Sequence, residues 1–116
     1  GWPLNGIPPG LYTAIQPNNI LVGNDSNPGD KFGFSVAIDN NNIIIGSPFN
    51  NSTGSIYIFN YLSNGNTWNQ LTKVVGNDTA TSDEFGTAVA VNNNIIVAGA
   101  PIHNSPYGAF YIFINN

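Results

Sequence analysis

The chain has 116 residues, of which 41% are hydrophobic and only 7% are charged, with a formal net charge of −4. Two lysines and no arginine cannot form the cationic cluster that replaces phosphate counterions, so we expect no nucleic-acid partner. Neither a basic patch nor a run of about 20 apolar residues is present, so we expect no membrane insertion. The lack of cysteine excludes disulfides and thiolate metal sites.

The N-terminal part of the chain divides into two segments. Residues 1–10 are rich in Pro and Gly, which predicts an extended arm. Trp2 and Leu4 are its candidate anchors on a partner, and the alternative is a loosely ordered tail. Residues 11–22 precede a Gly-Asn-Asp tripeptide in the same way as the apolar stretch at 67–75 does. We therefore expect a strand in both places.

The rest of the chain holds two copies of one all-β motif, at residues 22–60 and 75–115. The copies align with an offset of 53 positions, which becomes 54 after one inserted residue, and a period near 50 suits propeller blades. Asn-rich tripeptides predict hairpin turns, and no segment shows a helical period. The strands predicted from apolar and β-branched runs lie at 32–38, 42–47, 55–59, 85–91, 94–100 and 109–114.

Two short motifs recur in register in the copies. Phe-Gly begins the first strand of each copy, and Gly-Ser-Pro or Gly-Ala-Pro ends the second; the residues are Phe32, Gly33, Gly46, Pro48, Phe85, Gly86, Gly99 and Pro101. In these motifs the chain resembles FG-GAP repeats, known from integrin α-subunit propellers and many surface proteins, over about residues 20–115. The resemblance implies four-stranded antiparallel β-propeller-like blades and an extracellular or cell-surface location.

A propeller blade has four strands, and the predicted strands do not divide evenly between two blades. The first copy gains its fourth strand from residues 67–75, whereas the second copy has three. The strand at 11–22 is spare, and we expect it to complete the second blade of a neighbouring copy. The predicted organisation is an arm at 1–10, a donor strand at 11–22, a first blade at 23–75 and a second blade at 76–116.

Strand addition of this kind links copies of the chain head-to-tail, which produces either a closed ring or an open filament. It would also cover an unpaired sheet edge. The alternative is that the chain is a piece of a longer propeller whose other segments supply the missing strands. The residues expected at the subunit interface are Trp2, Leu4, Leu11, Tyr12, Ile15, Ile20, Val22, Ile112 and Ile114.

Many FG-GAP repeats bind calcium in an Asp-rich loop between their first two strands. Residues 38–42 and 91–94 occupy that position here; the loops are too short, and the second has no carboxylate, so we expect neither a metal nor a cofactor. A second group of acids also repeats between the copies. These either bind a cation weakly or, as we favour, accept backbone N–H groups at the turn before Phe-Gly; they are Asp25, Asp30, Asp78, Asp83 and Glu84.

Four N-x-[ST] sequons lie in predicted loops, at Asn24, Asn50, Asn51 and Asn77. Asn24 and Asn77 occupy equivalent positions of the two copies. We expect a covalent glycan on at least one sequon if a eukaryote secretes the protein. Glycans on the adjacent Asn50 and Asn51 would collide, so both should not be occupied together.

Catalysis finds little support in the sequence. His103 is the only histidine and is expected to be a solvated loop residue. No serine has an evident base to activate it, so we expect that the protein is not an enzyme. The strand aromatics should pack between blades; these are Tyr57, Phe59, Tyr111 and Phe113. Aromatics that border loops are candidates for sugar stacking; these are Tyr61, Trp68 and Tyr107.

The sequence therefore predicts a structural subunit that assembles with copies of itself into an extracellular filament or surface layer and carries glycans. The alternative is a propeller binding module, lectin-like or integrin-like, that recognises a glycan or a protein ligand.

Overall fold

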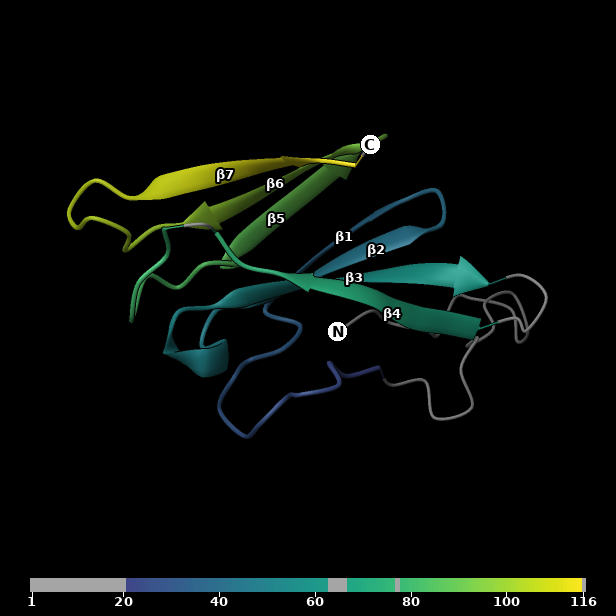
Figure 1. The fold of residues 1–116 in the computed structure, drawn as a ribbon, viewed down its shortest axis with the longest axis horizontal. Coiled ribbons are helices and arrows are strands. Elements are labelled where there is room, and N and C mark those ends of the chain that lie inside the picture. The colour runs from purple at the N-terminus through teal and green to yellow at the C-terminus, as the bar shows by residue number, and fades with distance from the viewer. Residues whose placement is uncertain (1–20, 63–66, 77, 116) are drawn as a thin grey trace, which may run out of the picture.

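The computed structural model describes residues 21–62, 67–76 and 78–115. Its strands form a four-stranded and a three-stranded antiparallel sheet, which lie one above the other in Figure 1. The first sheet contains β1 (Ser35–Asp39), β2 (Asn42–Ser47), β3 (Ser55–Leu62) and β4 (Thr67–Val74). The second contains β5 (Ala88–Asn92), β6 (Ile95–Ala100) and β7 (Ala109–Ile114). The predicted all-β class is confirmed.

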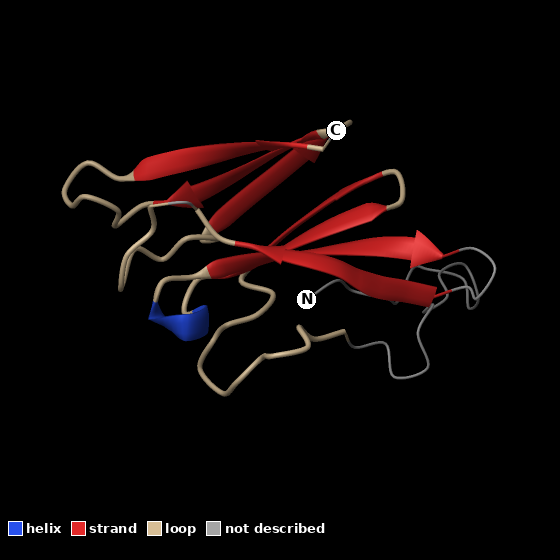
Figure 2. Cartoon of the chain, viewed as in Figure 1, coloured by secondary structure: helices blue, strands red, loops and turns tan. Residues whose placement is uncertain are grey.

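The connections are those of simple meanders, with strand orders β1-β2-β3-β4 and β5-β6-β7. The β1–β2 and β5–β6 turns each place an asparagine at positive φ, Asn40 at 53° and Asn93 at 53°, as their Asn-rich sequences predict. Among the described residues the only helical segment is one short 3₁₀ turn, η1 (Asn50–Ser52), drawn in blue in Figure 2. None of these residues forms a helix that could cross a bilayer.

The first strand of each copy begins three residues later than predicted, at Ser35 and Ala88 rather than at the Phe-Gly motif. Gly33 and Gly86 have φ values of 91° and 96°, which are incompatible with an extended strand. A turn closes around each of them, because Phe34 N–H donates to the Lys31 carbonyl at 3.0 Å and Thr87 N–H donates to the Glu84 carbonyl at 3.2 Å.

The fourth strand predicted at 67–75 is present as β4, which pairs with β3 over its length. The donor strand predicted at 11–22 lies outside the described residues except for Leu21 and Val22, which are not in a strand. The arm at 1–10 lies outside them altogether.

The core lies between the two sheets, which face each other. Ile44 and Ile56 of the first sheet form one buried cluster with Phe85 and with apolar residues of β6. Ala37, Ile58, Val89, Val91 and Phe113 pack around this cluster. β1 and β5 lie in contact, so the first strands of the two copies run side by side. One face of each sheet is therefore used to hold the two repeats together.

Candidate functional site: the outer faces and free edge of the sheets

The Phe-Gly motif of the second repeat joins the two sheets. Phe85 is fully buried, and its ring meets Tyr111 and Phe113 edge-on at centroid distances of 5.3 and 6.1 Å. Its backbone N–H donates to the Thr53 carbonyl at 3.0 Å, and Phe85 forms a parallel bridge with Gly54 of the first repeat. The motif thus supplies both a buried aromatic ring and a main-chain hydrogen bond across the junction.

The equivalent motif of the first repeat has the same contacts within its own sheet but no neighbouring repeat. The Phe32 ring meets Tyr57 and Phe59 edge-on at 5.2 and 6.2 Å, yet Phe32 is only half-buried. A Cβ built on Gly33 would have no described atom within 4 Å. The prediction that the strand aromatics pack between blades holds for Tyr111 and Phe113, which line the junction. Tyr57 and Phe59 lie on the opposite side of the first sheet.

The Gly-x-Pro motifs also differ between the repeats, since that of the first repeat is packed at the junction and that of the second is not. A Cβ on Gly46 would lie 1.9 Å from the Gly86 carbonyl oxygen, so only glycine allows the second repeat to approach this closely. At the equivalent Gly99, the nearest atom to a built Cβ is 3.9 Å away, on Ala88. Pro48 is buried, whereas its counterpart Pro101 is exposed.

An apolar surface remains open on each sheet. The outer face of the second sheet carries Phe110 and Ile112, whose exposed fractions are 67% and 58%. The register of β5, β6 and β7 gathers nine residues on this face, namely Ala88, Ala90, Asn92, Ile95, Val97, Gly99, Phe110, Ile112 and Ile114. The outer face of the first sheet carries Val36 and Ile38, exposed by 63% and 64%, and Phe32 packs on its β3 side; its other residues include Ile43, Ile45, Tyr57, Phe59 and Lys73.

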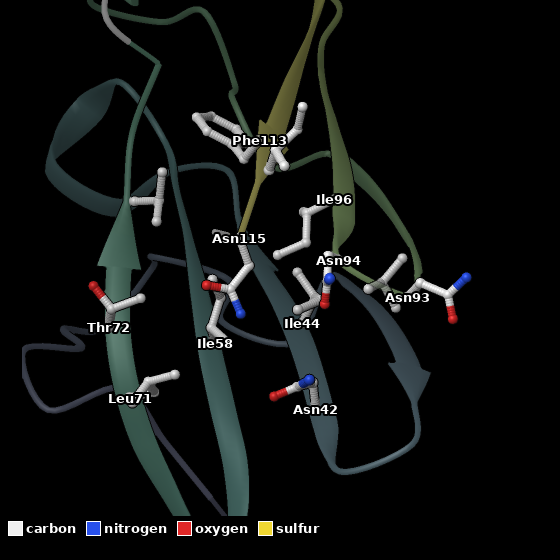
Figure 3. Close-up of a pocket in the computed structure, with 13 residues that line it drawn as sticks. Asn42, Ile44, Ile58, Leu71, Thr72, Asn93, Asn94, Ile96, Phe113 and Asn115 are labelled. Carbon is white, nitrogen blue, oxygen red and sulfur yellow. The ribbon is translucent and has the colours of Figure 1, made fainter.

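The second sheet also has a free edge. β3 is paired with β4, whereas no described strand pairs with the far edge of its counterpart β7. A groove of about 300 Å³ runs between β4 of the first sheet and the end of β7. Figure 3 shows Leu71 and Thr72 on one side of it and Phe113 and Asn115 on the other. The lining is largely apolar.

The family assignment agrees with this repeated architecture. The sequence model of the FG-GAP repeat matches the chain twice, at residues 17–59 and 68–113. The chain belongs to the FG-GAP repeat family. Together with the two antiparallel sheets, the two FG-GAP repeats identify a β-propeller-like module. No curated protein matches the chain.

Of the predicted interface residues, those within the described part of this FG-GAP chain are exposed. Ile112 lies on the outer face of the second sheet, and Ile114 follows it on the same strand. Val22 is exposed just before the first repeat. The others lie outside the described residues; they are Trp2, Leu4, Leu11, Tyr12, Ile15 and Ile20.

The repeated acids of the FG-GAP repeats fix turns. Asp30 Oδ2 accepts the Asn27 N–H at 2.9 Å, and Asp83 Oδ2 accepts the equivalent Ala80 N–H at 2.7 Å. For Asp30 and Asp83 these bonds agree with the favoured turn-capping interpretation. Across residues 21–62, 67–76 and 78–115, no three acid or histidine side chains gather in a way that could hold a metal ion.

A second acid in each repeat accepts a tyrosine hydroxyl. Asp25 Oδ1 accepts the Tyr57 hydroxyl at 2.6 Å and is ion-paired with Lys73; both contacts, the Lys73 bond first, lower the pKa of Asp25. Asp78 accepts the Tyr111 hydroxyl in the same way. Burial, and then this hydrogen bond, raises the pKa of Tyr111 to about 12. Both tyrosines therefore stay neutral and tie the loop to the sheet.

The turns where FG-GAP repeats often hold calcium do not fit that ion. Asp39 is the one carboxylate in the two turns, and its Oδ2 accepts the Asn93 backbone N–H of the other turn. A calcium ion wants six to eight oxygen ligands, several of them charged. Asp39 instead links the β1–β2 turn to the β5–β6 turn.

His103 is not the solvated loop residue expected from the sequence. Its Nδ1 lies 2.6 Å from Asp83 Oδ2, and its Nε2 lies 3.5 Å from Asp78 Oδ2. The hydrogen bond to Asp83 raises the pKa of His103 and lowers that of Asp83. The equivalent residue of the first repeat, Asn50, donates its Nδ2 to Asp30 at 2.9 Å. His103 holds the loop of the second repeat through an ion pair, and Asn50 holds the equivalent loop of the first repeat through an amide hydrogen bond.

We expect this pair to make stability depend on pH. Because the folded-state pKa of His103 is raised above its ordinary value of 6.5, the stabilisation is fully present below that value and is lost as pH rises through the folded-state pKa. The melting temperature should therefore fall more between about pH 6 and pH 8.5 in the unmodified chain than in His103→Asn, which carries the first repeat's residue. Parallel pH dependences of the two proteins would contradict the pairing.

The sequons differ in their suitability for glycan. Asn50 is fully buried, and its Oδ1 also accepts the Ser55 hydroxyl at 2.6 Å, so a glycan cannot be attached there without breaking the fold. Asn51 is exposed in η1, and Asn24 is exposed with its side chain bonded to Gln70. Asn77 lies outside the described residues.

The aromatics proposed for sugar stacking are not gathered into one site. The rings of Tyr61 and Trp68 contact each other across β3 and β4 at a centroid distance of 5.3 Å and an interplanar angle of 49°. Tyr107 lies on the β6–β7 loop and is 83% exposed.

Proposed function

We propose that this chain is a structural subunit that links head-to-tail with copies of itself through strand addition at β7. The observation that carries the proposal is the difference between the two sheets. In the first sheet β4 covers the edge of β3, whereas no described strand covers the equivalent edge at β7. An unpaired edge of this kind is a template for another strand, because its main-chain N–H and C=O groups lack partners.

The proposed donor is the segment 11–22 of a neighbouring copy. β4 belongs to the first sheet and leads directly into Gly76 at the start of the second repeat. Segment 11–22 leads into Gly23 in the same way, and the two glycines have equivalent settings. A Cβ would lie 2.6 Å from the Tyr57 ring at Gly23 and 2.7 Å from the Tyr111 ring at Gly76. By this equivalence, segment 11–22 would pair with the second sheet of the copy that precedes the first repeat.

The groove near the end of β7 offers apolar contacts to a donor strand. It opens between the facing sides of the two sheets, and residues of β4 and of β7 are part of its lining. Leu71 is exposed along it, and Val74 and Phe113 add to its apolar lining. Apolar residues of a donor strand would be removed from water there, which contributes about 25 cal/mol for each Å² buried.

We further propose that the assembly lies outside the cell, at a surface or in a filament, and carries glycan. Membership of the FG-GAP repeat family favours the location, since these repeats are typical of surface proteins. The exposed Asn51 and Asn24 are the described positions that leave room for a glycan.

Electron microscopy of the negatively stained chain tests this function. We expect linear or closed assemblies of many 12.3 kDa subunits, with a repeat along the assembly that corresponds to two blades. Images that show only isolated single subunits, even when the protein is concentrated, would refute the structural role.

A binding module is the second candidate, and the exposed Tyr107 ring on the β6–β7 loop is the observation that favours it. An aromatic ring at a loop tip can stack on the apolar face of a sugar. Reproducible hits on a glycan array, abolished by Tyr107→Ala, would shift the function to recognition. No hits would leave the structural role as the better account.

A further inference from the structure

We propose that the copies also stack sheet on sheet, so that the outer face of the second sheet of one copy packs on the outer face of the first sheet of the next copy. The inference rests on the proposed assembly and adds a second interface to it. The occupant of each open face is a second copy of this chain. The junction between copies repeats the junction that already holds the two repeats of one chain together.

The first argument is that the outer face of the second sheet is the counterpart of a buried face. Two of its three cross-strand rows are Ala90–Val97–Ile112 and Ala88–Gly99–Phe110. The equivalent rows of the first sheet are Ala37–Ile44–Ile58 and Ser35–Gly46–Ile56, and these face the second sheet across the core. The same pattern is therefore covered in the first repeat and exposed in the second.

The second argument concerns the outer face of the first sheet. It is the counterpart of the inner face of the second sheet, which covers the first sheet in the core. Phe85, Val89, Val91, Ile96 and Ala98 of the second repeat pack against the first sheet. Their equivalents in the first repeat are, in the same order, Phe32, Val36, Ile38, Ile43 and Ile45, which lie on the outer face of the first sheet. Each open face thus matches one half of an interface that the chain already forms.

The glycines at the internal junction and their counterparts on the outer faces support the same match. Gly46 and Gly86 meet at the internal junction, where a Cβ on Gly46 would lie 1.9 Å from the Gly86 carbonyl oxygen. Their counterparts Gly99 and Gly33 have open space around them in the described chain. A glycine in the middle of a strand weakens it by about 0.5–1 kcal/mol relative to alanine. Gly99 within β6 is explained if the Gly33 carbonyl of another copy approaches it.

The polar links of the internal junction also have equivalents. Phe85 N–H donates to the Thr53 carbonyl, and the corresponding groups are the Phe32 N–H of one copy and the Tyr107 carbonyl of the next. Asn93 N–H donates to the Asp39 side chain, and Asn40 and Asn92 occupy the matching positions. The amide oxygen of Asn92 can accept as the Asp39 carboxylate does.

Charge does not oppose the stacking. The outer face of the second sheet contains no charged residue, and the one lysine on the outer face of the first sheet, Lys73, lies over the Tyr57 ring and is ion-paired with Asp25 within its own repeat, so two copies of this acidic chain can meet there without like charges in contact. Val36, Ile38, Phe110 and Ile112 are each more than half exposed, and their removal from water favours association. The same faces are an aggregation hazard while they remain uncovered.

Two complementary variants test the stacking. Ile38→Asp places a charge on the outer face of the first sheet, and Ile112→Asp places one on the outer face of the second. Both positions are more than half exposed, so each isolated chain should still fold, which circular dichroism checks. Every junction needs one intact face of each kind, so each variant alone should be monomeric by light scattering. An equimolar mixture should give a dimer of the two variants, because one intact junction is restored.

The control is Leu62→Asp, which changes an exposed apolar residue at the end of β3, outside both faces, and should assemble like the unmodified chain. Strand addition is tested separately by deleting residues 1–22. If the deletion abolishes assembly while both face variants assemble normally, the stacking is overturned and strand addition stands. If the face variants are monomeric and restore each other while the deletion has no effect, the stacking stands and strand addition fails. An unmodified chain that remains monomeric would overturn both.

Discussion

Replacing Phe85 with alanine is expected to lower the free energy of unfolding by about 3–5 kcal/mol. The ring is fully buried at the junction of the sheets and contacts Tyr111 and Phe113. Its loss leaves a cavity in the only core cluster that spans both repeats among the described residues, and the backbone around it is held by the bridge to Gly54. The surrounding sheets can therefore collapse only partly into the space.

Phe32→Ala is the matched control for this prediction. Phe32 has the same two edge-on ring contacts in its own repeat, but it is half-buried because no repeat covers it in the described chain. Since less apolar area is lost, its cost should be smaller by at least about 1 kcal/mol. Urea denaturation of both variants measures the difference. Equal losses would show that Phe85 has no special role at the junction.

Most of the strands could be predicted from the sequence. β2 and β7 have the predicted bounds, because a continuous apolar run flanked by turn residues leaves few alternatives. The starts of β1 and β5 could not be predicted from apolar pattern alone. Gly33 and Gly86 have positive φ in turns where their N–H groups donate to the carbonyls of Gly46 and Gly99, on the next strand of the same repeat. Local propensity contains no information on those contacts.

The side-chain partners in the loops were harder to predict. The sequence marks His103 as a single histidine, and only the fold brings the carboxylates of Asp83 and Asp78 to it. Alignment of the two copies contains one signal for this role. His103 is equivalent to Asn50, so a structural role for one suggests a structural role for the other. The same comparison would have weakened the sequon at Asn50.

The asymmetry between the outer faces could not be predicted either. The sequences of the two copies are similar in both strand faces, so the pattern alone cannot say which face of which copy is covered. In the structure, Gly46 and Phe85 are packed against the other repeat, whereas their counterparts Gly99 and Phe32 are not. This difference identifies the surfaces that a further copy would occupy.

The most direct test of head-to-tail assembly is the mass in solution, by light scattering, of the chain that lacks residues 1–22. A deletion of residues 1–10 alone is its control, because it removes the arm and keeps the donor strand. We expect the intact chain to form species well above 12.3 kDa that grow with concentration, and the shorter deletion to weaken them without abolishing them. The account predicts that the 1–22 deletion leaves a single folded subunit at every concentration, and an assembly mass unchanged by that deletion would contradict it.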